Sequence, residues 1–585
     1  MLLCLICAFV AYHGIFGAEF IGLDDAIQHQ TVQQGISREG LRWAFTTTHA
    51  ARWQPIVWIS YMLDTTLQGF HPTSFHRTNV LLHLINIILV FVLAQKITRN
   101  GIAAAIATML FAIHPAHVES VVFIAERQGL LGMAFGCASL IAYLEYGVSN
   151  KQRYYIAACF GLALALMSNS AWLPLPLLFL LLDAWPLDRL KANAKVSALQ
   201  GELLTEKLPF FILVVGINGV SGYVQYRSSA FLGLDTLSLW GRIANAAISF
   251  WRYLWHIIYP LRLAVFYPHP IRWPIWLSLP AVFGLAACCY IGIRKWQQFP
   301  RIGWAFAWFT LTLLPVLGFT QTGWHAMADR FLYLPAVGLY IVTGLGVATI
   351  FHRFRAPVIV AGSLLVVSML VLSQRQTAYW QNSIALFSRA ISVTNNNWVM
   401  HNSLGAAFSH AGQFSEASHH FEEAVNINPD NATAWFNLGH VRFVQERWDE
   451  AAKHFERSLA LAPNYRARFN LAVTYTRRGA LREAQETYLY LLESNPHHIP
   501  SLLNLGRLYR DQEKYAQALA CYRLVKKADP QNPQARTGIA IAMLATADDP
   551  MPAISVLIAL IEEDAGNTEA REALQGVIHG EASQR

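Results

Sequence analysis

Apolar and polar positions alternate along this chain over distances that suit lipid rather than water. Apolar runs long enough to cross a bilayer recur from the first residues to about residue 373. The pattern predicts crossings near residues 2–20, 79–98, 101–113, 130–147, 154–170, 171–187, 208–225, 274–293, 302–320, 333–350 and 356–373. We interpret residues 1–20 as a retained first helix rather than a cleaved signal peptide, because they lack a basic leader and a small-residue cleavage site.

One aromatic stretch complicates this count of eleven crossings. Residues 240–267 are apolar enough to span, but a further crossing there would move every later loop to the other side of the membrane. We therefore expect a re-entrant or interfacial segment, whose Trp and Tyr side chains lie at headgroup depth.

The cationic loops between the apolar runs predict the orientation. They contain Lys96/Arg99, Lys151/Arg153, Arg189/Lys191/Lys195, Arg294/Lys295/Arg301 and His352/Arg353/Arg355. Short loops rich in Lys and Arg stay cytoplasmic, and eleven crossings place all five on one side. We expect a multi-pass protein of the plasma (inner) membrane with a cytoplasmic N-terminus. The same count puts Asp24, Asp25 and the C-terminal domain on the periplasmic or lumenal side.

From about residue 396 the pattern changes to a repeat with a period of 33 or 34 residues. Four landmarks stay in phase: Pro429, Pro463, Pro496 and Pro530; Ala417, Ala451, Ala484 and Ala518; Phe421, Phe455, Tyr488 and Tyr522; and Gly405, Gly439, Ala472 and Gly506. This period and these residue types predict four tetratricopeptide repeats over 396–530.

The repeats set the expected domain organisation. We predict an all-α protein with a polytopic membrane domain at 1–375, a linking half-repeat helix at 376–395, and a degenerate repeat with a capping helix at 531–585. Because such arrays form an α-solenoid with a concave binding face, we expect a protein or peptide partner there.

Composition supports the assignment to a membrane. The chain is 54% hydrophobic and only 14% charged, whereas soluble domains contain about 25% charged residues. The net charge of +8 comes partly from cations between apolar runs, so we expect membrane lipid rather than nucleic acid as a partner. The seven cysteines do not form metal-ligand spacings.

Three loops on the expected non-cytoplasmic side combine polar and aromatic residues: 21–78, 114–127 and 324–335. The first also has amphipathic stretches that predict helices lying along the membrane surface. Because ionisable groups at membrane depth are costly, convergence of these loops would form a functional site. The candidate residues are Asp24, Asp25, His76, Glu119, Arg127, Asp329 and Arg330.

Residue chemistry alone leaves alternatives open for these candidates. Asp24 or Asp25 could cap the following helix rather than act in catalysis. Arg127 and Arg330 could clamp a phosphate or form ordinary buried ion pairs. The cluster His114-x-x-His117-x-Glu119 could ligate a metal, but a hydrogen-bonded helix terminus is the interpretation we favour.

Several motifs resemble, in order, a known family. They are Leu23-Asp24-Asp25-Ala26-Ile27, Trp53-Gln54-Pro55, residues 75–83, residues 111–119 followed by Arg127, and residues 328–335. Together with the repeats, they resemble the transmembrane and tetratricopeptide repeat (TMTC-like) family of O-mannosyltransferases and its bacterial relatives, within the class C glycosyltransferase fold. The resemblance covers nearly the whole chain.

The resemblance implies a membrane enzyme that moves a sugar, with mannose expected, from a polyprenyl-phosphate donor to Ser or Thr of a protein recruited by the repeats. It implies that Asp24 or Asp25 is the base, with inversion at the sugar carbon. Arg330 and Arg127 would supply positive charge to the leaving phosphate. The remaining substrate-binding candidates are His76, Glu119 and Asp329, and no divalent metal is expected.

Two positions depart from the family pattern. Gly129 stands where an Asp is usual two residues after Arg127, and Gln54 stands where an Arg before Pro55 is common. Both changes remove polar groups near the expected site. The alternative is therefore a catalytically inactive, membrane-anchored repeat scaffold for protein–protein interaction. A transporter is less favoured, because the sequence shows no paired internal repeats with broken helices.

Overall fold

The computed structural model describes the chain except for residues 190–195, 229–236, 320–322, 579 and 581–585. Lys191 and Lys195, predicted to be cytoplasmic, lie outside the described residues. The chain divides into two compact units, Met1–Ser403 and Leu404–Arg585, and the division falls inside helix α18 (Trp398–His410). Both units are built almost entirely of helices, which confirms the all-α prediction.

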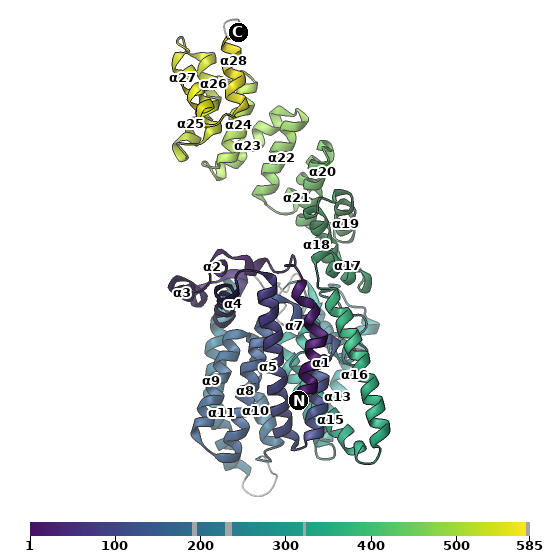
Figure 1. Ribbon diagram of the computed structural model, residues 1–585. Coiled ribbons are helices and arrows are strands. Elements are labelled where there is room, and N and C mark those ends of the chain that lie inside the picture. The colour runs from purple at the N-terminus through teal and green to yellow at the C-terminus, as the bar shows by residue number, and fades with distance from the viewer. Residues whose placement is uncertain (190–195, 229–236, 320–322, 579, 581–585) are drawn as a thin grey trace. The chain divides into compact units, whose positions relative to one another are not determined.

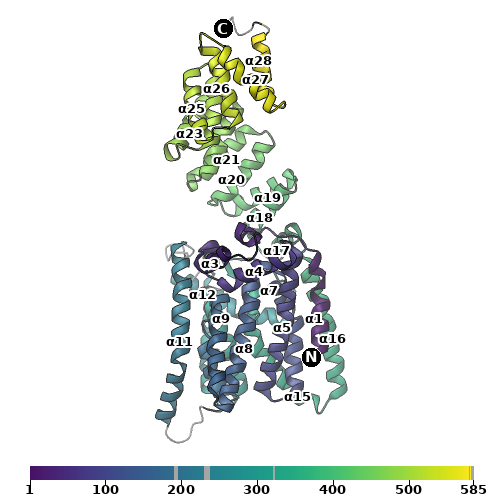
Figure 2. The ribbon, with the colours of Figure 1, turned by 60° about the vertical axis from the view of Figure 1, so that its left-hand side comes forward.

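The first unit is a bundle of long helices that run side by side (Figures 1 and 2). Each predicted apolar run is helical over much of its length. The helices are α1 (Leu2–Tyr12), α5 (Pro72–Thr98), α6 (Gly101–Ile113), α8 (Arg127–Ser149), α9 (Gln152–Ser168), α10 (Leu175–Ala184), α11 (Val196–Arg227), α13 (Ile275–Arg294), α14 (Pro300–Leu313), α15 (Pro335–Phe351) and α16 (Arg355–Ala378).

Within the described residues, five helical segments are long and apolar enough to cross a bilayer by themselves. They are Pro72–Thr98, Ile124–Ser149, Leu203–Arg227, Ile275–Arg294 and Arg355–Ala378. A sixth candidate is α6 with the following segment Pro115–Val122, which are bent by 55° relative to each other. The chain is thus a membrane protein, and the count of eleven crossings stays a prediction for the shorter helices.

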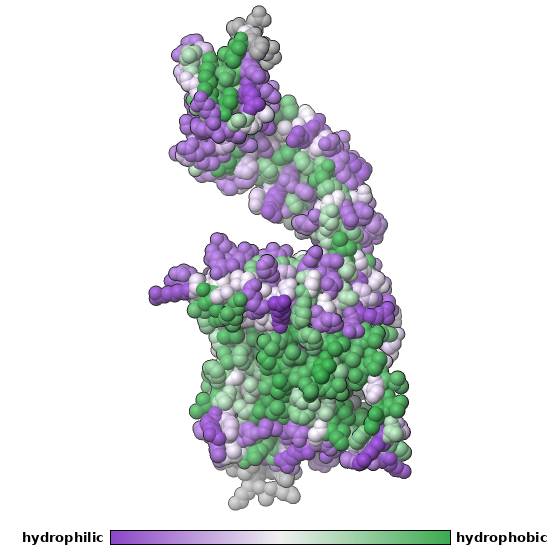
Figure 3. All heavy atoms as spheres, viewed as in Figure 1, coloured by the Kyte–Doolittle hydropathy of each residue, from purple (hydrophilic) through white to green (hydrophobic). Residues whose placement is uncertain are grey.

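The surface of this unit matches a bilayer. Figure 3 shows a band of apolar residues across the bundle, with hydrophilic residues at both of its ends. Helices α13 and α16 expose side chains that a soluble domain would bury, and Trp276, Phe283 and Leu364 are each at least 65% exposed. Exposed side chains of this size are stable only in an apolar surrounding.

The first polar loop contains short helices, and their position along the membrane surface stays a prediction. They are the 3-10 helix η2 (Asp25–Gln28), α2 (Gln30–Gln33), α3 (Arg38–Thr46), the 3-10 helix η3 (His49–Ala51) and α4 (Pro55–Gln68). These short elements gather at one end of the bundle (Figures 1 and 2). Their core contains Trp58, Tyr61 and Phe75, all buried, so the loop is packed against the bundle rather than extended.

The aromatic stretch at 240–267 forms helix α12 (Leu239–Ile258) and then a short strand, β1 (Tyr267–Pro268). Strand β1 pairs antiparallel with β2 (His325–Met327). Asn245 and Ser249 on α12 donate hydrogen bonds to the carbonyl of Ala326 at 2.9 and 3.2 Å. The segment therefore holds the third polar loop, and its re-entrant position in the membrane stays a prediction.

Helix α17 (Ser383–Val393) lies within the segment predicted to be a half-repeat, and it belongs to the first unit. The backbone N–H of Gly22 donates to Ser383 Oγ at 2.9 Å, and Arg389 donates to the carbonyl of Leu261 at 2.6 Å. After α17, Asn397 donates to the carbonyl of Phe266 at 3.2 Å. This helix thus braces both the loop that carries Asp24 and the loop that precedes β1.

The second unit is an array of paired helices. The pairs, counting α18, are α18 with α19 (Phe414–Ile427), α20 (Ala432–Val444) with α21 (Trp448–Leu461), α22 (Tyr465–Arg478) with α23 (Leu481–Ser494), and α24 (Ile499–Asp511) with α25 (Tyr515–Ala528). Helices α26 (Pro533–Thr546), α27 (Met551–Glu563) and α28 (Thr568–Ile578) follow.

The small residues of the repeat have a steric cause. A Cβ atom added at Gly405 or Gly439 would lie 2.8 Å from the ring of Phe421 or Phe455, respectively. Glycine therefore lets the two helices of a pair approach until the aromatic ring of the second packs against the backbone of the first. This contact explains why the glycine and aromatic positions repeat in phase.

Candidate functional site

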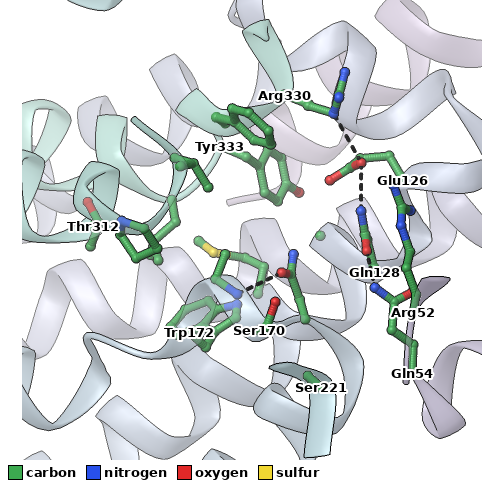
Figure 4. Close-up of a pocket in the computed structure, with 18 of the residues that line it drawn as sticks. Arg52, Gln54, Glu126, Gln128, Ser170, Trp172, Ser221, Thr312, Arg330 and Tyr333 are labelled. Carbon is green, nitrogen blue, oxygen red and sulfur yellow. Dashed lines mark hydrogen bonds and ion pairs between the residues drawn. The ribbon is translucent and has the colours of Figure 1, made fainter. Parts of the chain in front are cut away.

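A polar cavity of about 260 Å³ lies in the first unit, and all three polar loops line it (Figure 4). The first loop contributes Arg52 and Gln54, the second contributes Glu126, and the third contributes Arg330. The rest of the wall includes Gln128, Gly129, Asn169, Ser170, Trp172, Thr312, His325 and Tyr333. The loops that the sequence singled out thus converge on one cavity.

Arg330 is the best-anchored charge in the cavity wall. Its guanidinium pairs with Glu119, and its Nε lies 3.4 Å from Glu126 Oε2. The backbone N–H of Arg330 also donates to Glu119 Oε2 at 3.1 Å. Desolvation alone would lower the pKa of Arg330, but the two carboxylates outweigh it and raise this pKa. Arg330 is therefore a fixed cation at the edge of the cavity.

Arg52 is a second cation in the same wall, and it lies on the side of Gln54 and Glu126 in Figure 4. Surrounding protein atoms lower its pKa by desolvation; the charge of Glu126 opposes this shift and that of Arg330 reinforces it. Within the described residues, no carboxylate pairs with Arg52, and its side chain stays accessible because it borders the cavity. Its charge is therefore available to an anionic ligand.

A chain of amide and carboxylate groups connects the two positions that depart from the family pattern. Gln54 donates to Gln128, and Gln128 donates to Glu126 Oε2 at 3.1 Å (Figure 4). A Cβ atom at Gly129 would lie 2.9 Å from Glu126 Oε1. The carboxylate of Glu126 thus takes up the space beside residue 129, so the departures leave this wall polar rather than apolar.

Asp24 is buried just behind this wall, with 1% of its surface exposed. Its Oδ2 accepts a hydrogen bond from the backbone N–H of Ile21 at 3.0 Å. Burial raises the pKa of Asp24 to about 7, although the backbone N–H groups of Ile21 and Ala125 oppose the shift. Ala125 immediately precedes Glu126, which places the Asp24 carboxylate next to the cavity lining without being part of it.

The two aspartates differ in their surroundings. Asp25 is exposed and begins η2, and the Asp24 side chain forms no capping hydrogen bond to that helix. The capping alternative for Asp24 is therefore not the arrangement that the structure shows. Asp24, Arg52, Glu126 and Arg127 all lie close enough to Tyr61 for their charges to act on it. Asp24 is therefore part of the charged surroundings of the cavity.

Arg127 lies outside the cavity wall, and its donors are directed to protein groups. Its Nε donates to Asn79 Oδ1 at 2.8 Å, and one Nη donates to the carbonyl of Phe75 at 2.8 Å. The other Nη pairs with Asp64 and donates to Ser60 Oγ at 3.1 Å. A phosphate-binding role for Arg127 stays a prediction, and the observed contacts are those of a residue that fixes the first loop against α8.

His76 and Asp329 also lie outside the cavity lining. His76 is buried on α5 beside the backbone of Val122 and near Arg127. Asp329 accepts hydrogen bonds from Tyr267 Oη and His256 Nδ1, both at 2.7 Å. Asp329 therefore fixes the start of the segment that carries Arg330. Neither His76 nor Asp329 lines the cavity.

The histidine cluster at 114–119 adopts the helix-terminus arrangement. His114 Nδ1 accepts from the backbone N–H of Ala116 at 3.2 Å, and His117 Nε2 lies 3.2 Å from Tyr340 Oη. Among the described residues, no three His, Cys, Asp or Glu side chains come together as a possible metal site.

Sequence reasoning missed two residues of the wall as candidates, Arg52 and Glu126. Both were visible as polar residues in the singled-out loops, but no spacing distinguishes them from their neighbours. Arg52 follows Ala50 and Ala51, which adopt φ values of 55° and 56°. A left-handed backbone at two successive alanines is uncommon, and alanine gives no local signal for it. The turn that directs Arg52 to the cavity is thus set by tertiary packing.

Family models identify the repeats. Two models described as tetratricopeptide repeat match residues 403–466 and 439–499, and residues 499–532. Among solved structures, YrrB, a tetratricopeptide protein with an unusual peptide-binding site, is 18% identical; the match covers 33% of this chain and all of that chain, with a TM-score of 0.30. Pseudomonas aeruginosa PilF is 20% identical over 34% of this chain and 87% of that chain, with a TM-score of 0.29.

Curated relatives extend over the membrane unit as well. Human protein O-mannosyl-transferase TMTC3 is 22% identical over 536 residues, which is 82% of this chain and 58% of the relative. Drosophila melanogaster protein O-mannosyl-transferase Tmtc1 is 24% identical over 66% of this chain and 55% of the relative. The chain thus spans a little over half the length of these relatives. The matches confirm the resemblance to the TMTC-like family.

Proposed function

Because the curated relatives along most of the chain are TMTC-type protein O-mannosyl-transferases, we propose that this membrane protein is a glycosyltransferase. The proposed reaction transfers a sugar, with mannose expected, from a polyprenyl-phosphate donor to a Ser or Thr hydroxyl of a protein. The single observation that carries the proposal is the polar cavity in which Arg52 and Arg330 face one space. Arg330 is paired with Glu119 and Glu126, but Arg52 borders the same cavity without a carboxylate partner among the described residues, which suits the binding of an anion.

The two arginines fit the chemistry of the donor. When the acceptor oxygen attacks the anomeric carbon, the bond from that carbon to the phosphate oxygen breaks, and the phosphate leaves with the electron pair. Negative charge therefore grows on the phosphate, and guanidinium groups match its geometry. Arg330 is held by Glu119 and Glu126, whereas Arg52 has a charge that no described carboxylate pairs with.

Asp24 is the proposed base for the acceptor proton. A base works best when its pKa is close to the working pH, and burial raises the pKa of Asp24 to about 7. Glu126 is a second candidate, because it borders the cavity whereas Asp24 lies behind Ala125. Attack from the face opposite the phosphate gives inversion at the sugar carbon.

Transfer of labelled sugar tests the proposal. The purified full-length protein in lipid nanodiscs is incubated with labelled polyprenyl-phosphate mannose and an acceptor protein, and label on Ser or Thr is measured by mass spectrometry. We expect Asp24→Asn to reduce transfer by about 10²–10⁴-fold, while Asp25→Asn, at an exposed site, retains it. Comparison with Glu126→Gln identifies which carboxylate takes the proton.

The inactive scaffold makes the opposite prediction. If Asp24→Asn and Asp25→Asn both kept every cellular function of the protein, and no labelled sugar were transferred by the wild type, the enzyme proposal would fail. The repeats would then be the functional part, and the membrane unit would be their anchor.

We propose that the repeat array brings the acceptor protein to the membrane unit, which requires both on one side of the bilayer. The five cationic loops support an orientation with the N-terminus in the cytoplasm and the repeats in the periplasm or lumen. Single cysteines introduced near Asp24 and near Pro463 can be labelled in intact cells with a membrane-impermeant maleimide. Labelling of both sites from outside is expected, and labelling of only one would contradict the proposal.

A further inference from the structure

A groove of about 540 Å³ lies in the repeat unit, along α18, α20, α22 and the start of α24. The four helices are the first members of successive pairs (Figure 1). The lining residues from these helices include aromatic rings, such as Phe469, and cationic or titratable groups, namely Arg466, His410 and His440. No Asp or Glu is among the described residues that line the groove.

The absence of acids extends from the groove to whole helices. Helices α18, α20 and α22 contain no Asp or Glu, whereas their partners α19, α21 and α23 contain three each. The repeat unit therefore separates charge between the two helices of each pair. Because field lines concentrate in a concave surface lined by one sign of charge, the groove attracts the opposite sign.

Arg466 is the cation best placed to act on a ligand. It lies in the first turn of α22, is exposed, and pairs with no carboxylate in the part of the chain that the structure describes. Two other arginines of these helices are engaged: Arg442 pairs with Glu422 and Glu450, and Arg478 pairs with Asp449. The charge of Arg466 is therefore available to a ligand from outside the repeat array.

An asparagine adds a means of binding a peptide main chain. Asn470 lines the groove from α22, the helix that also carries Arg466. A side-chain amide offers both a donor and an acceptor, which matches the N–H and C=O of an extended peptide.

We propose that this groove binds an extended, acidic segment of a protein partner, whose carboxylates pair with Arg466. Asn470 holds its main chain, and the aromatic rings contact the stems of its side chains. That the partner is the protein to be glycosylated rests on the proposed function; the binding itself does not.

Direct binding to the full-length protein in nanodiscs tests this proposal. Two fluorescent peptides are compared by anisotropy: one alternates Glu and Ser, and the other carries Gln in place of each Glu. The Glu peptide should bind about tenfold more tightly, and its affinity should fall as salt is raised, because exposed ion pairs are screened. Equal affinity for both peptides would overturn the proposal.

Arg466→Glu provides the decisive variant. An acidic residue in the first turn suits the helix dipole, so α22 should remain folded, and a far-UV spectrum and gel filtration check this. The substitution should weaken binding of the Glu peptide by about tenfold or more. Arg477→Glu is the matched control, because Arg477 is exposed on the same helix and lies outside the groove lining; equal losses in both variants would contradict the proposal.

Two further measurements separate this proposal from other outcomes. Asp24→Asn should bind the Glu peptide like the wild type, so that loss of sugar transfer with retained binding refutes neither proposal. Retained transfer to an acceptor without preference for acidic peptides would reject the groove proposal and keep the proposed function. Self-association that Arg466→Glu abolishes would instead assign the groove to a second copy of the chain.

Discussion

The arginines of the membrane unit fall into two groups, which differ in the partners of their guanidinium groups. Arg127 is fully buried, and its guanidinium bonds to Asp64, Asn79, Ser60 and Phe75. Arg330 and Arg52 border the cavity, and Arg52 pairs with no carboxylate among the described residues. An arginine whose donors are all taken by the protein stabilises the fold, whereas one that borders a cavity with donors left can bind an anion.

The difference also concerns what removal of each charge would leave behind. Without Arg127, Asp64 keeps a buried carboxylate whose one hydrogen-bond donor among the described residues is the hydroxyl of Thr78. Without Arg52, no described carboxylate loses a partner. We therefore expect a substitution at Arg127 to lower the stability of the fold and a substitution at Arg52 to lower the activity.

Arg127→Met should have the largest effect. Breaking a buried pair by removing one partner costs about 3–5 kcal/mol, because the other charge is left uncompensated. We expect a large fall in the thermal midpoint of the purified protein in detergent, followed by tryptophan fluorescence. The double variant Arg127→Met/Asp64→Asn, which removes both charges, should recover part of the loss. An unchanged midpoint in Arg127→Met would show that Arg127 is not a structural residue.

Arg52→Met should reverse the balance between stability and activity. Loss of a group that stabilises developing charge lowers turnover by about 10²–10³-fold, so we expect this fall in sugar transfer with an unchanged thermal midpoint. Arg42→Met is the control, because Arg42 is exposed on α3 in the same loop and does not line the cavity. Equal transfer rates in Arg52→Met and the wild type would remove the cavity from the proposal.

The pH dependence of transfer should report the titration of Asp24. Its folded pKa, raised by burial to about 7, means that only the fraction ionised at a given pH can accept the acceptor proton. Transfer should rise about tenfold per pH unit below pH 7 and level off above it. Glu126→Gln should keep this midpoint if Asp24 is the base, and a midpoint that disappears only in Glu126→Gln would assign the proton to Glu126.

The same shift predicts a trend in stability with the opposite sign. A carboxyl whose folded pKa is raised binds its proton more tightly in the folded state, so stability falls as pH rises from about 4 to about 7. Asp24→Asn cannot ionise and should not show that fall. The difference in the urea midpoint between the two proteins should therefore widen over this interval in favour of the variant.

The sequence was sufficient for features that depend on local patterns. Apolar runs predict the helices of the bundle because each run contains its own signal, and the steric contact of Gly405 with Phe421 recurs at Gly439 with Phe455 and at Gly506 with Tyr522. The polar loops were also identified, because Asp24, Glu119 and Arg330 stand out in apolar surroundings. The cavity wall contains residues from all three polar loops.

Roles that depend on distant contacts could not be predicted. Arg127 and Arg330 look alike in sequence, and their partners decide the difference: Asp64 lies 63 residues from Arg127, and Glu119 lies 211 residues from Arg330. Arg52 depends on a left-handed turn at two alanines, for which the residues give no cue. The brace from α17 to Gly22 joins positions 361 residues apart.

That brace provides the smallest expected effect and extends the comparison to a group outside the cavity. Ser383 Oγ accepts the backbone N–H of Gly22, two residues before Asp24, so Ser383 is a positioning residue for the proposed base. Ser383→Ala leaves that N–H without its partner, and a hydrogen bond of this kind contributes about 1 kcal/mol. We expect kcat for transfer to fall about fivefold, with KM for the donor unchanged.

Ser383→Thr, which keeps the hydroxyl, should restore the rate. Ser392→Ala on the same helix is the control, because Ser392 is exposed and its hydroxyl donates to the carbonyl of Arg389 within α17. A purely structural role for α17 would lower the thermal midpoint in Ser383→Ala and leave kcat per folded molecule as it is, and that result would separate the brace from the chemistry at Asp24.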